Sequence, residues 1–196
     1  MLKYMPPAIC FAVLLTMTLV SANATSQQHV NLYPNLPAPI GGEKILITSA
    51  GQAAEGSILY TIADNLHVDA DFRPRALDSD LYDYNSVVIV LGYSANGLEQ
   101  TNRTYQAEQS RITKLAGEAT QNQIPVILVN LSGAYRHDKP TWALFNQIIP
   151  NTDYYIGLKT MKNMDQYLDI LASHNVPVTL VNDFSDIRTP FNSVFR

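Results

Sequence analysis

The chain has 196 residues, a net charge of −4 and a hydrophobic content of 46%, which is enough apolar material for one globular domain with its own core. The acidic balance disfavours non-specific binding to nucleic acid or to anionic membranes. The single cysteine, Cys10, lies in an N-terminal apolar run, so the rest of the chain offers no disulfide, thiolate nucleophile or cysteine-based metal site.

The first 24 residues have the three parts of a secretory signal peptide. Lys3 supplies positive charge, residues 8–20 are apolar, and Ala22-Asn23-Ala24 has the small residues of a cleavage site. We therefore expect cleavage after Ala24 and an exported protein, periplasmic or extracellular. The apolar run is short for a membrane span, so no span is expected after cleavage; an uncleaved anchor is the alternative.

The first strand and helix follow an extended lead-in. Residues 25–42 contain three prolines and end in two glycines, with no helical or alternating period. Residues 45–47 form an apolar run typical of a strand that is buried on both faces. After the small polar turn 48–52, apolar residues recur at helical spacing up to Leu66. Strand, turn and helix make the first half of a βαβ unit, whose helix N-terminus lies at the carboxyl edge of the sheet.

The remainder of the chain alternates in the same way. Further strands are predicted at 68–72, 86–91, 124–129, 154–157 and 177–181. Helices are predicted at 102–122, 142–149 and 163–174, the last capped by Asn163, with one helical turn at 77–84 and a loop at 93–99. This alternation predicts a three-layer α/β sandwich with a mostly parallel sheet of five to six strands in flavodoxin-like or Rossmann-like order. The predicted domain spans residues 43–184, and residues 185–196 are predicted to form an irregular tail.

The fold places the candidate site at one edge of the sheet. In an open parallel sheet, ligands bind beyond the carboxyl ends of the strands, near the point where the strand order reverses. This rule selects the loops 49–52, 93–96, 130–139 and 157–163. The first loop offers a hydroxyl, an amide and backbone N–H groups, which suit a carboxylate or phosphate. The ordinary alternative is a plain strand-to-helix turn.

Two further loops add candidate contacts. Tyr93 could stack on a ligand ring, and Ser94 and Asn96 could form hydrogen bonds with it. Arg136, together with Lys139, could form a cationic lip over an anionic ligand, although a solvated charge cluster is the plainer interpretation. The predicted ligand-binding residues are Ser49, Gly51, Gln52, Tyr93, Ser94, Asn96 and Arg136.

Catalytic and cofactor motifs are weak in this sequence. A hydrolase could use Ser132 or Ser94 with His137, but Asp138 is adjacent to His137 and badly placed to orient its ring, and no Gly-x-Ser-x-Gly elbow exists. The first turn lacks the Gly-Lys-Ser/Thr ending of a phosphate loop, and the histidines have no metal-ligand spacing. We therefore predict no cofactor, no metal and no catalytic residue. A module that binds a small, anionic ligand is favoured over a hydrolase or a protein-partner accessory module; no protein partner is indicated.

Several segments also resemble a known family. They are Ile-Thr-Ser-Ala-Gly-Gln at 47–52, Val-Ile-Val-Leu-Gly at 88–92 with Asn96-Gly97-Leu98, Ile-Pro-Val-Ile at 124–127, Gly133 with Arg136, and Val-Pro-Val-Thr-Leu-Val at 176–181. In these the sequence resembles an uncharacterised family of exported bacterial α/β proteins. The resemblance implies export and a flavodoxin-like fold, and it implies no activity.

Overall fold

The computed structural model describes residues 35–133, 136 and 138–196; the predicted signal peptide and most of the lead-in lie outside these residues. Its centre is a six-stranded, all-parallel sheet in the order β2-β1-β3-β4-β5-β6. The strands are β1 (Ile45–Ala50), β2 (Ala70–Phe72), β3 (Ser86–Leu91), β4 (Val126–Asn130), β5 (Tyr154–Leu158) and β6 (Val178–Val181). The strand order reverses between β1 and β3, which confirms the predicted α/β sheet with flavodoxin-like order.

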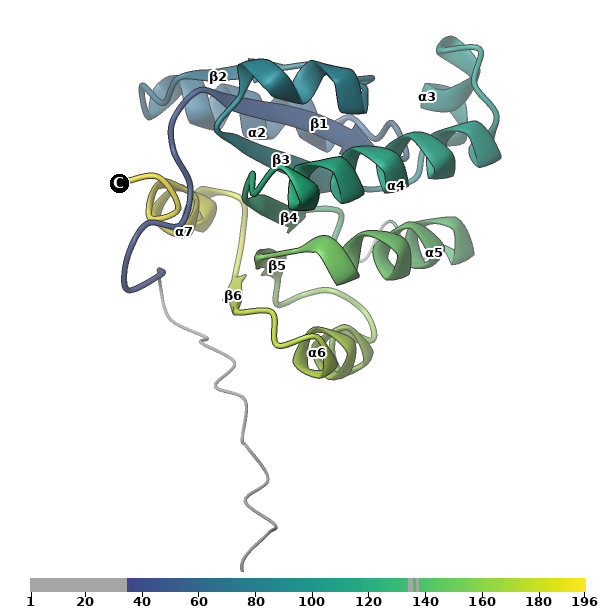
Figure 1. Ribbon diagram of the computed structural model, residues 1–196. Coiled ribbons are helices and arrows are strands. Elements are labelled where there is room, and N and C mark those ends of the chain that lie inside the picture. The colour runs from purple at the N-terminus through teal and green to yellow at the C-terminus, as the bar shows by residue number, and fades with distance from the viewer. Residues whose placement is uncertain (1–34, 134–135, 137) are drawn as a thin grey trace, which may run out of the picture.

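Helices cover both faces of the sheet (Figure 1). The helices of the described residues are α2 (Glu55–Asn65), α3 (Ala95–Gln100), α4 (Tyr105–Gln121), α5 (Lys139–Ile148), α6 (Met164–Ser173) and α7 (Arg188–Asn192), with 3-10 turns η1 (Asp78–Asp83), η2 (Ile149–Asn151) and η3 (Ser185–Ile187). Of these, α3 contributes to neither core. One core joins the sheet to η1, α4, α5 and α6. The other joins it to α2 and α7.

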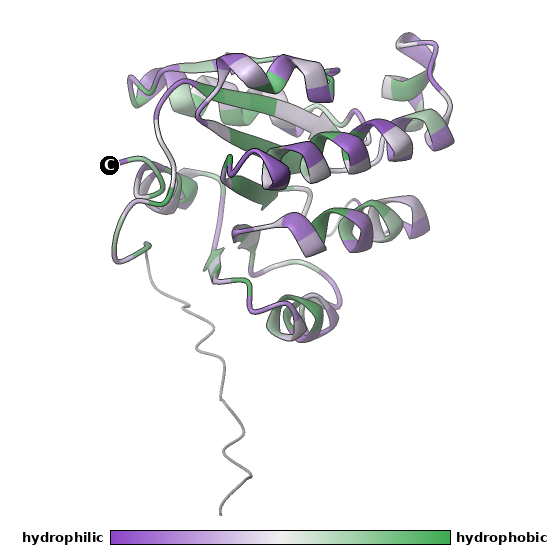
Figure 2. Cartoon of the chain, viewed as in Figure 1, coloured by the Kyte–Doolittle hydropathy of each residue, from purple (hydrophilic) through white to green (hydrophobic). Residues whose placement is uncertain are grey.

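The central strands are apolar because both of their faces are covered. Every residue of β1, β3, β4 and β5 is buried, as is typical of parallel strands between two helical layers. Figure 2 shows these strands as mostly hydrophobic, with hydrophilic residues along the outer sides of the helices. β1 and β3 pair over their full length, from Ile45 opposite Ser86 to Ala50 opposite Leu91. Their carboxyl ends, and the loops that follow them, therefore lie at the same level.

Three local details differ from the sequence prediction. The loop predicted at 93–99 contains the short helix α3, whose N-cap Ser94 accepts a hydrogen bond from the Gly97 N–H at 3.1 Å. Helix α5 begins three residues earlier than predicted, because Asp138 caps it by accepting from the Thr141 N–H at 2.8 Å. Asn163 does precede α6, but its side chain makes no capping hydrogen bond.

The residues predicted to be an irregular tail form an ordered part of the core instead. They contain η3 and α7, and Ile187, Phe191 and Val194 are fully buried against the sheet. The carbonyl oxygen of Val194 also accepts hydrogen bonds from the N–H groups of Ile40 and Gly41. The helical spacing of these apolar residues is interrupted by polar residues and Pro190 in the sequence, which hides the short helix. The folded unit therefore includes residues 185–196.

Candidate functional site

The turn between β1 and α2 packs against the loop after β3. The Ala53 N–H donates to the carbonyl oxygen of Gly92 at 3.1 Å, and the Ser94 N–H donates to that of Gly51 at 2.8 Å. Gly51 and Gln52 have φ angles of 95° and 61°, a region that favours glycine. A Cβ atom on Gly51 would lie 2.6 Å from the Gly92 oxygen. The structure thus brings two predicted site loops together, in contact with each other.

The polar donors of this turn are already bound by a carboxylate of the chain itself. Glu108 Oε1 accepts from the Gly51 N–H at 3.0 Å and from Gln52 Nε2 at 2.9 Å. Gln52 Nε2 also donates to the carbonyl oxygen of Pro74 at 2.8 Å. Glu108 is completely buried. The groups that were expected to hold a carboxylate or phosphate ligand therefore hold a carboxylate from α4.

Arg111, one turn further along α4, completes this buried network. Its Nε donates to Glu108 Oε2 at 2.9 Å and its Nη2 donates to Glu108 Oε1 at 2.7 Å. The guanidinium also donates to the carbonyl oxygens of Ala76, at 2.7 Å, and of Ser49. This bidentate pair joins α4 to the end of β1 and to the segment before η1.

Electrostatics keep the Glu108 carboxyl ionised in spite of its burial. Burial raises its pKa, but the hydrogen bonds and charge of Arg111, with the hydrogen bonds of Gln52 and Gly51, outweigh burial and leave the pKa below its usual value. The sequence prediction missed this pair. The available signal was its spacing, because positions 108 and 111 continue the inward-facing stripe that runs on through Ile112.

The remaining residues of the predicted site lie around the same two loops. Ser49 is buried, with 1% of its surface exposed. The Tyr93 ring meets the ring of Tyr105 edge-to-face, with centroids 5.6 Å apart. Ser94 caps α3, and Asn96 is exposed on that helix. The predicted residues lie close to one another, since Arg136 also reaches the Tyr93 carbonyl oxygen, at 2.7 Å. The contacts described for Gly51, Gln52 and Ser94 hold the loops in place.

A cavity of about 690 Å³ lies beside these loops at the carboxyl edge of the sheet. It is formed by the first turn of α2 and by the segments that follow β4, β5 and β6. Among the described residues, the lining consists of Ala54, Glu55, Ile58, Leu131, Ser132, Gly133, Arg136, Leu158, Thr160, Asn182, Asp183 and Phe184. Its volume is within the range of small-molecule sites. Arg136 is the one member of the predicted site that lines it.

The cationic group of this cavity is paired with an acid. Arg136 Nε donates to Glu55 Oε1 at 2.9 Å, and its Nη1 donates to the carbonyl oxygen of Tyr93 at 2.7 Å. Glu55 is the first residue of α2, where a carboxylate interacts favourably with the helix dipole. The other oxygen of this carboxylate, Oε2, is buried and has no hydrogen-bond partner in the described part of the chain.

The hydroxyl groups suggested for a hydrolase are engaged in the fold. Ser132 is 3% exposed, and its Oγ donates to the carbonyl oxygen of Leu91 at 3.2 Å. Ser94 Oγ serves as the cap of α3. His137 lies outside the described residues. Within residues 35–133, 136 and 138–196, no group of three His, Cys, Asp or Glu side chains is placed to hold a metal ion.

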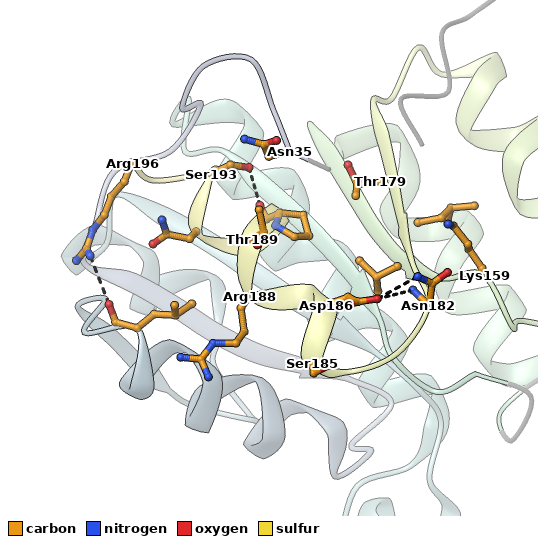
Figure 3. A pocket seen from close by; sticks show the side chains of 15 residues that line it. Asn35, Lys159, Thr179, Asn182, Ser185, Asp186, Arg188, Thr189, Ser193 and Arg196 are labelled. Atoms are coloured by element: carbon orange, nitrogen blue, oxygen red, sulfur yellow. Dashed lines mark hydrogen bonds between the residues drawn. The ribbon is translucent and has the colours of Figure 1, made fainter. Parts of the chain in front are cut away.

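A second hollow, of about 640 Å³, surrounds α7 beside β6. Figure 3 shows a hydrogen bond between the neighbouring side chains of Asn182 and Asp186 in its lining; Asn182 Nδ2 donates to Asp186 Oδ2 at 3.1 Å. Arg196, which also lines this hollow, pairs with Glu43 at 2.7 Å. Because open parallel sheets bind ligands at the carboxyl edge, we place the candidate site in the carboxyl-edge cavity.

Strand order, helical layers and the position of the cavity define an open-sheet α/β protein with its candidate site at the carboxyl edge. The chain belongs to the family described as Domain of unknown function (DUF6305), whose model matches residues 42–195. That match includes all six strands and the whole lining of the cavity. No curated protein and no solved structure matches the chain. In the portion that the structure describes, no helix is long and apolar enough to cross a membrane.

Proposed function

We propose that the protein is exported and binds a small organic molecule in the carboxyl-edge cavity without transforming it. One observation carries this proposal: segments that follow four of the six strands converge on a space of about 690 Å³. The carboxyl edge is where open parallel sheets bind their ligands, and the volume suits a small molecule. Export is supported by the sequence of residues 1–24.

The lining has the mixture of surfaces that a small-molecule site requires. Leu131 and Leu158 are buried, whereas Ile58 and Phe184 keep 43% and 39% of their surfaces exposed. A ligand that covers these two side chains removes apolar area from water, at about 25 cal/mol for each Å². Ser132, Thr160 and Asn182 add polar groups to the same lining, and such groups would orient the ligand.

The contacts of Arg136 give little support to the expected binding of an anionic ligand. An anionic ligand at Arg136 would have to compete with the Glu55 carboxylate, which already accepts from the guanidinium at 2.9 Å. The hydrolase alternative likewise gains no support, because Ser132 and Ser94 have structural partners. Simple binding therefore fits the described residues best.

The first experiment identifies the ligand. The protein is purified from its own exporting host without added ligand and is measured by native mass spectrometry. We expect a bound small molecule, released on denaturation, whose fragmentation gives its chemical class. An unliganded mass, followed by no thermal stabilisation from any member of a broad metabolite library, would contradict the proposal.

The second experiment locates the ligand. Thr160→Trp places a large side chain at an exposed position of the cavity, and Thr189→Trp makes the same change in the hollow around α7. We expect Thr160→Trp to weaken ligand binding at least tenfold, while Thr189→Trp leaves it unchanged. Equal losses in the two variants, with both folded by circular dichroism, would place the ligand elsewhere.

A further inference from the structure

Among the described residues that line the carboxyl-edge cavity, negative charges outnumber positive ones. Its described lining contains two carboxylates, Glu55 and Asp183, and one guanidinium, Arg136. Since Glu55 and Arg136 are paired at 2.9 Å, their charges offset each other. Asp183, contributed by the segment after β6, is the remaining charge among the described residues of the lining.

Asp183 keeps its negative charge through local hydrogen bonds. Its Oδ1 accepts from the Ser185 N–H at 2.8 Å, from Ser185 Oγ at 2.6 Å and from the Asp186 N–H at 3.3 Å. The hydrogen bonds from Ser185 are the main reason that the pKa of Asp183 lies below its usual value. All three contacts use Oδ1, so the described residues leave the other oxygen open to a ligand.

Glu55 provides a second and independent indication, namely that the ligand carries a hydrogen-bond donor. Its Oε2 is a buried acceptor without a donor in the described part of the chain. Buried acceptors in folded proteins are normally satisfied, and each exception calls for an explanation. A ligand that reaches the Glu55–Arg136 pair with an N–H or O–H group could supply this donor after a small shift of the pair, whereas a carboxylate or phosphate could not.

Resting on the proposed function, we infer that the ligand is a cationic amine with a compact apolar body. The apolar body lies against Ile58, Leu158 and Phe184, and the ammonium group faces Asp183 and the carboxylate of Glu55. The net charge of −4 also favours the approach of a cation over that of an anion. This inference replaces the anionic ligand that was expected from the turn at 49–52 and from Arg136.

Three probes that differ only in the polar group at one end test this inference on the full mature chain. Phenethylamine, 2-phenylethanol and 3-phenylpropionate share a ring and a two-carbon linker but are cationic, neutral and anionic. We expect phenethylamine to bind at least tenfold more tightly than 3-phenylpropionate, with shifts in the amide resonances of Gly133 and Phe184. Tighter binding of 3-phenylpropionate at those resonances would overturn the inference while the proposed function stands. If no probe shifts them at millimolar concentration, the inference also fails; the proposed function is judged separately, by the co-purified ligand.

A pair of charge variants separates the local carboxylate from the overall charge. Asp183→Asn removes a charge at the cavity, and Asp64→Asn removes one from an exposed position near the end of α2. We expect Asp183→Asn to weaken phenethylamine binding about fivefold and Asp64→Asn to leave it unchanged. Wild-type affinity should also fall as salt is added. Equal affinities in the two variants, or an affinity that is insensitive to salt, would overturn the assignment of the ammonium group to Asp183.

Discussion

At the scale of single residues, the most constrained group is the buried pair of Glu108 and Arg111. The two side chains are 0% and 2% exposed and lie 2.7 Å apart. Their remaining hydrogen-bonding capacity is used by the β1–α2 turn and by backbone carbonyl groups. Such a pair is tolerated in a core because its polar atoms are satisfied, and removing one partner leaves an uncompensated charge.

We expect Arg111→Gln to lower the free energy of unfolding by about 3–5 kcal/mol, since Glu108 loses the partner that offsets the cost of burying its carboxyl group. Glu108→Gln should also destabilise the protein, and the double variant should lose less than the sum of the two single losses. Urea denaturation of the four proteins measures this coupling. Additive losses would show that the pair has no interaction energy.

The same pair predicts a pH dependence of stability. The pKa of Glu108 is lower in the folded protein than its ordinary value of 4.5. A carboxyl group of this kind contributes stability that is fully present above the unfolded pKa and is lost as the pH falls through the folded pKa. The free energy of unfolding should therefore decrease below about pH 4.5, and less steeply in Glu108→Gln. Parallel pH profiles for the two proteins would contradict this assignment.

At the scale of elements, α7 is the part of the fold that the sequence conceals best. The helix has five residues, yet Phe191 is fully buried and its ring meets that of Phe195 at 5.3 Å. We expect Phe191→Ala to cost about 3–5 kcal/mol of unfolding free energy, as large-to-small changes in cores do. Phe184→Ala is the matched control: its ring is 39% exposed in the cavity lining, so it should affect ligand binding more than stability. Similar melting temperatures for the two variants would refute the core role of α7.

The sequence predicts the elements well where one physical signal dominates. Buried parallel strands such as β1 and β3 are short apolar runs, and all six predicted strands are present. The short helices α3 and α7 escape prediction because they have too few residues to show a period. Asn163 shows a related limit, because its residue type indicates the start of α6 but does not decide whether its side chain caps the helix.

The sequence predicts where the candidate site lies better than it predicts which residues line it. Strand order alone points to the carboxyl edge, and Arg136 lies there. Glu108 and Arg111 were missed because charged residues on a helical stripe are normally taken to face solvent. Glu55 follows the first strand of the chain and Asp183 follows the last, so only the folded chain shows that they line one cavity.

At the scale of the whole molecule, the position of the cavity depends on the two loops that follow β1 and β3, which pack against each other and fill the space where the strand order reverses. The strand order reverses between β1 and β3, and a ligand crevice normally opens there. Here the turn at 51–53 pairs with the loop at 92–94, and the Glu108 carboxylate accepts a hydrogen bond from the Gly51 N–H. The available space therefore lies towards α2, β4, β5 and β6.

The final prediction concerns the processing of the chain in its host. Residues 1–24 have the charge, apolar run and small residues of a cleaved signal, and the family match begins only at residue 42. Removal of residues 1–24 would therefore leave the entire sheet and cavity intact. We expect the protein from an exporting host to begin at Thr25 by intact mass and N-terminal sequencing, and to appear in the soluble exported fraction. A membrane-bound chain that retains residues 1–24 would show instead that the apolar run is an anchor.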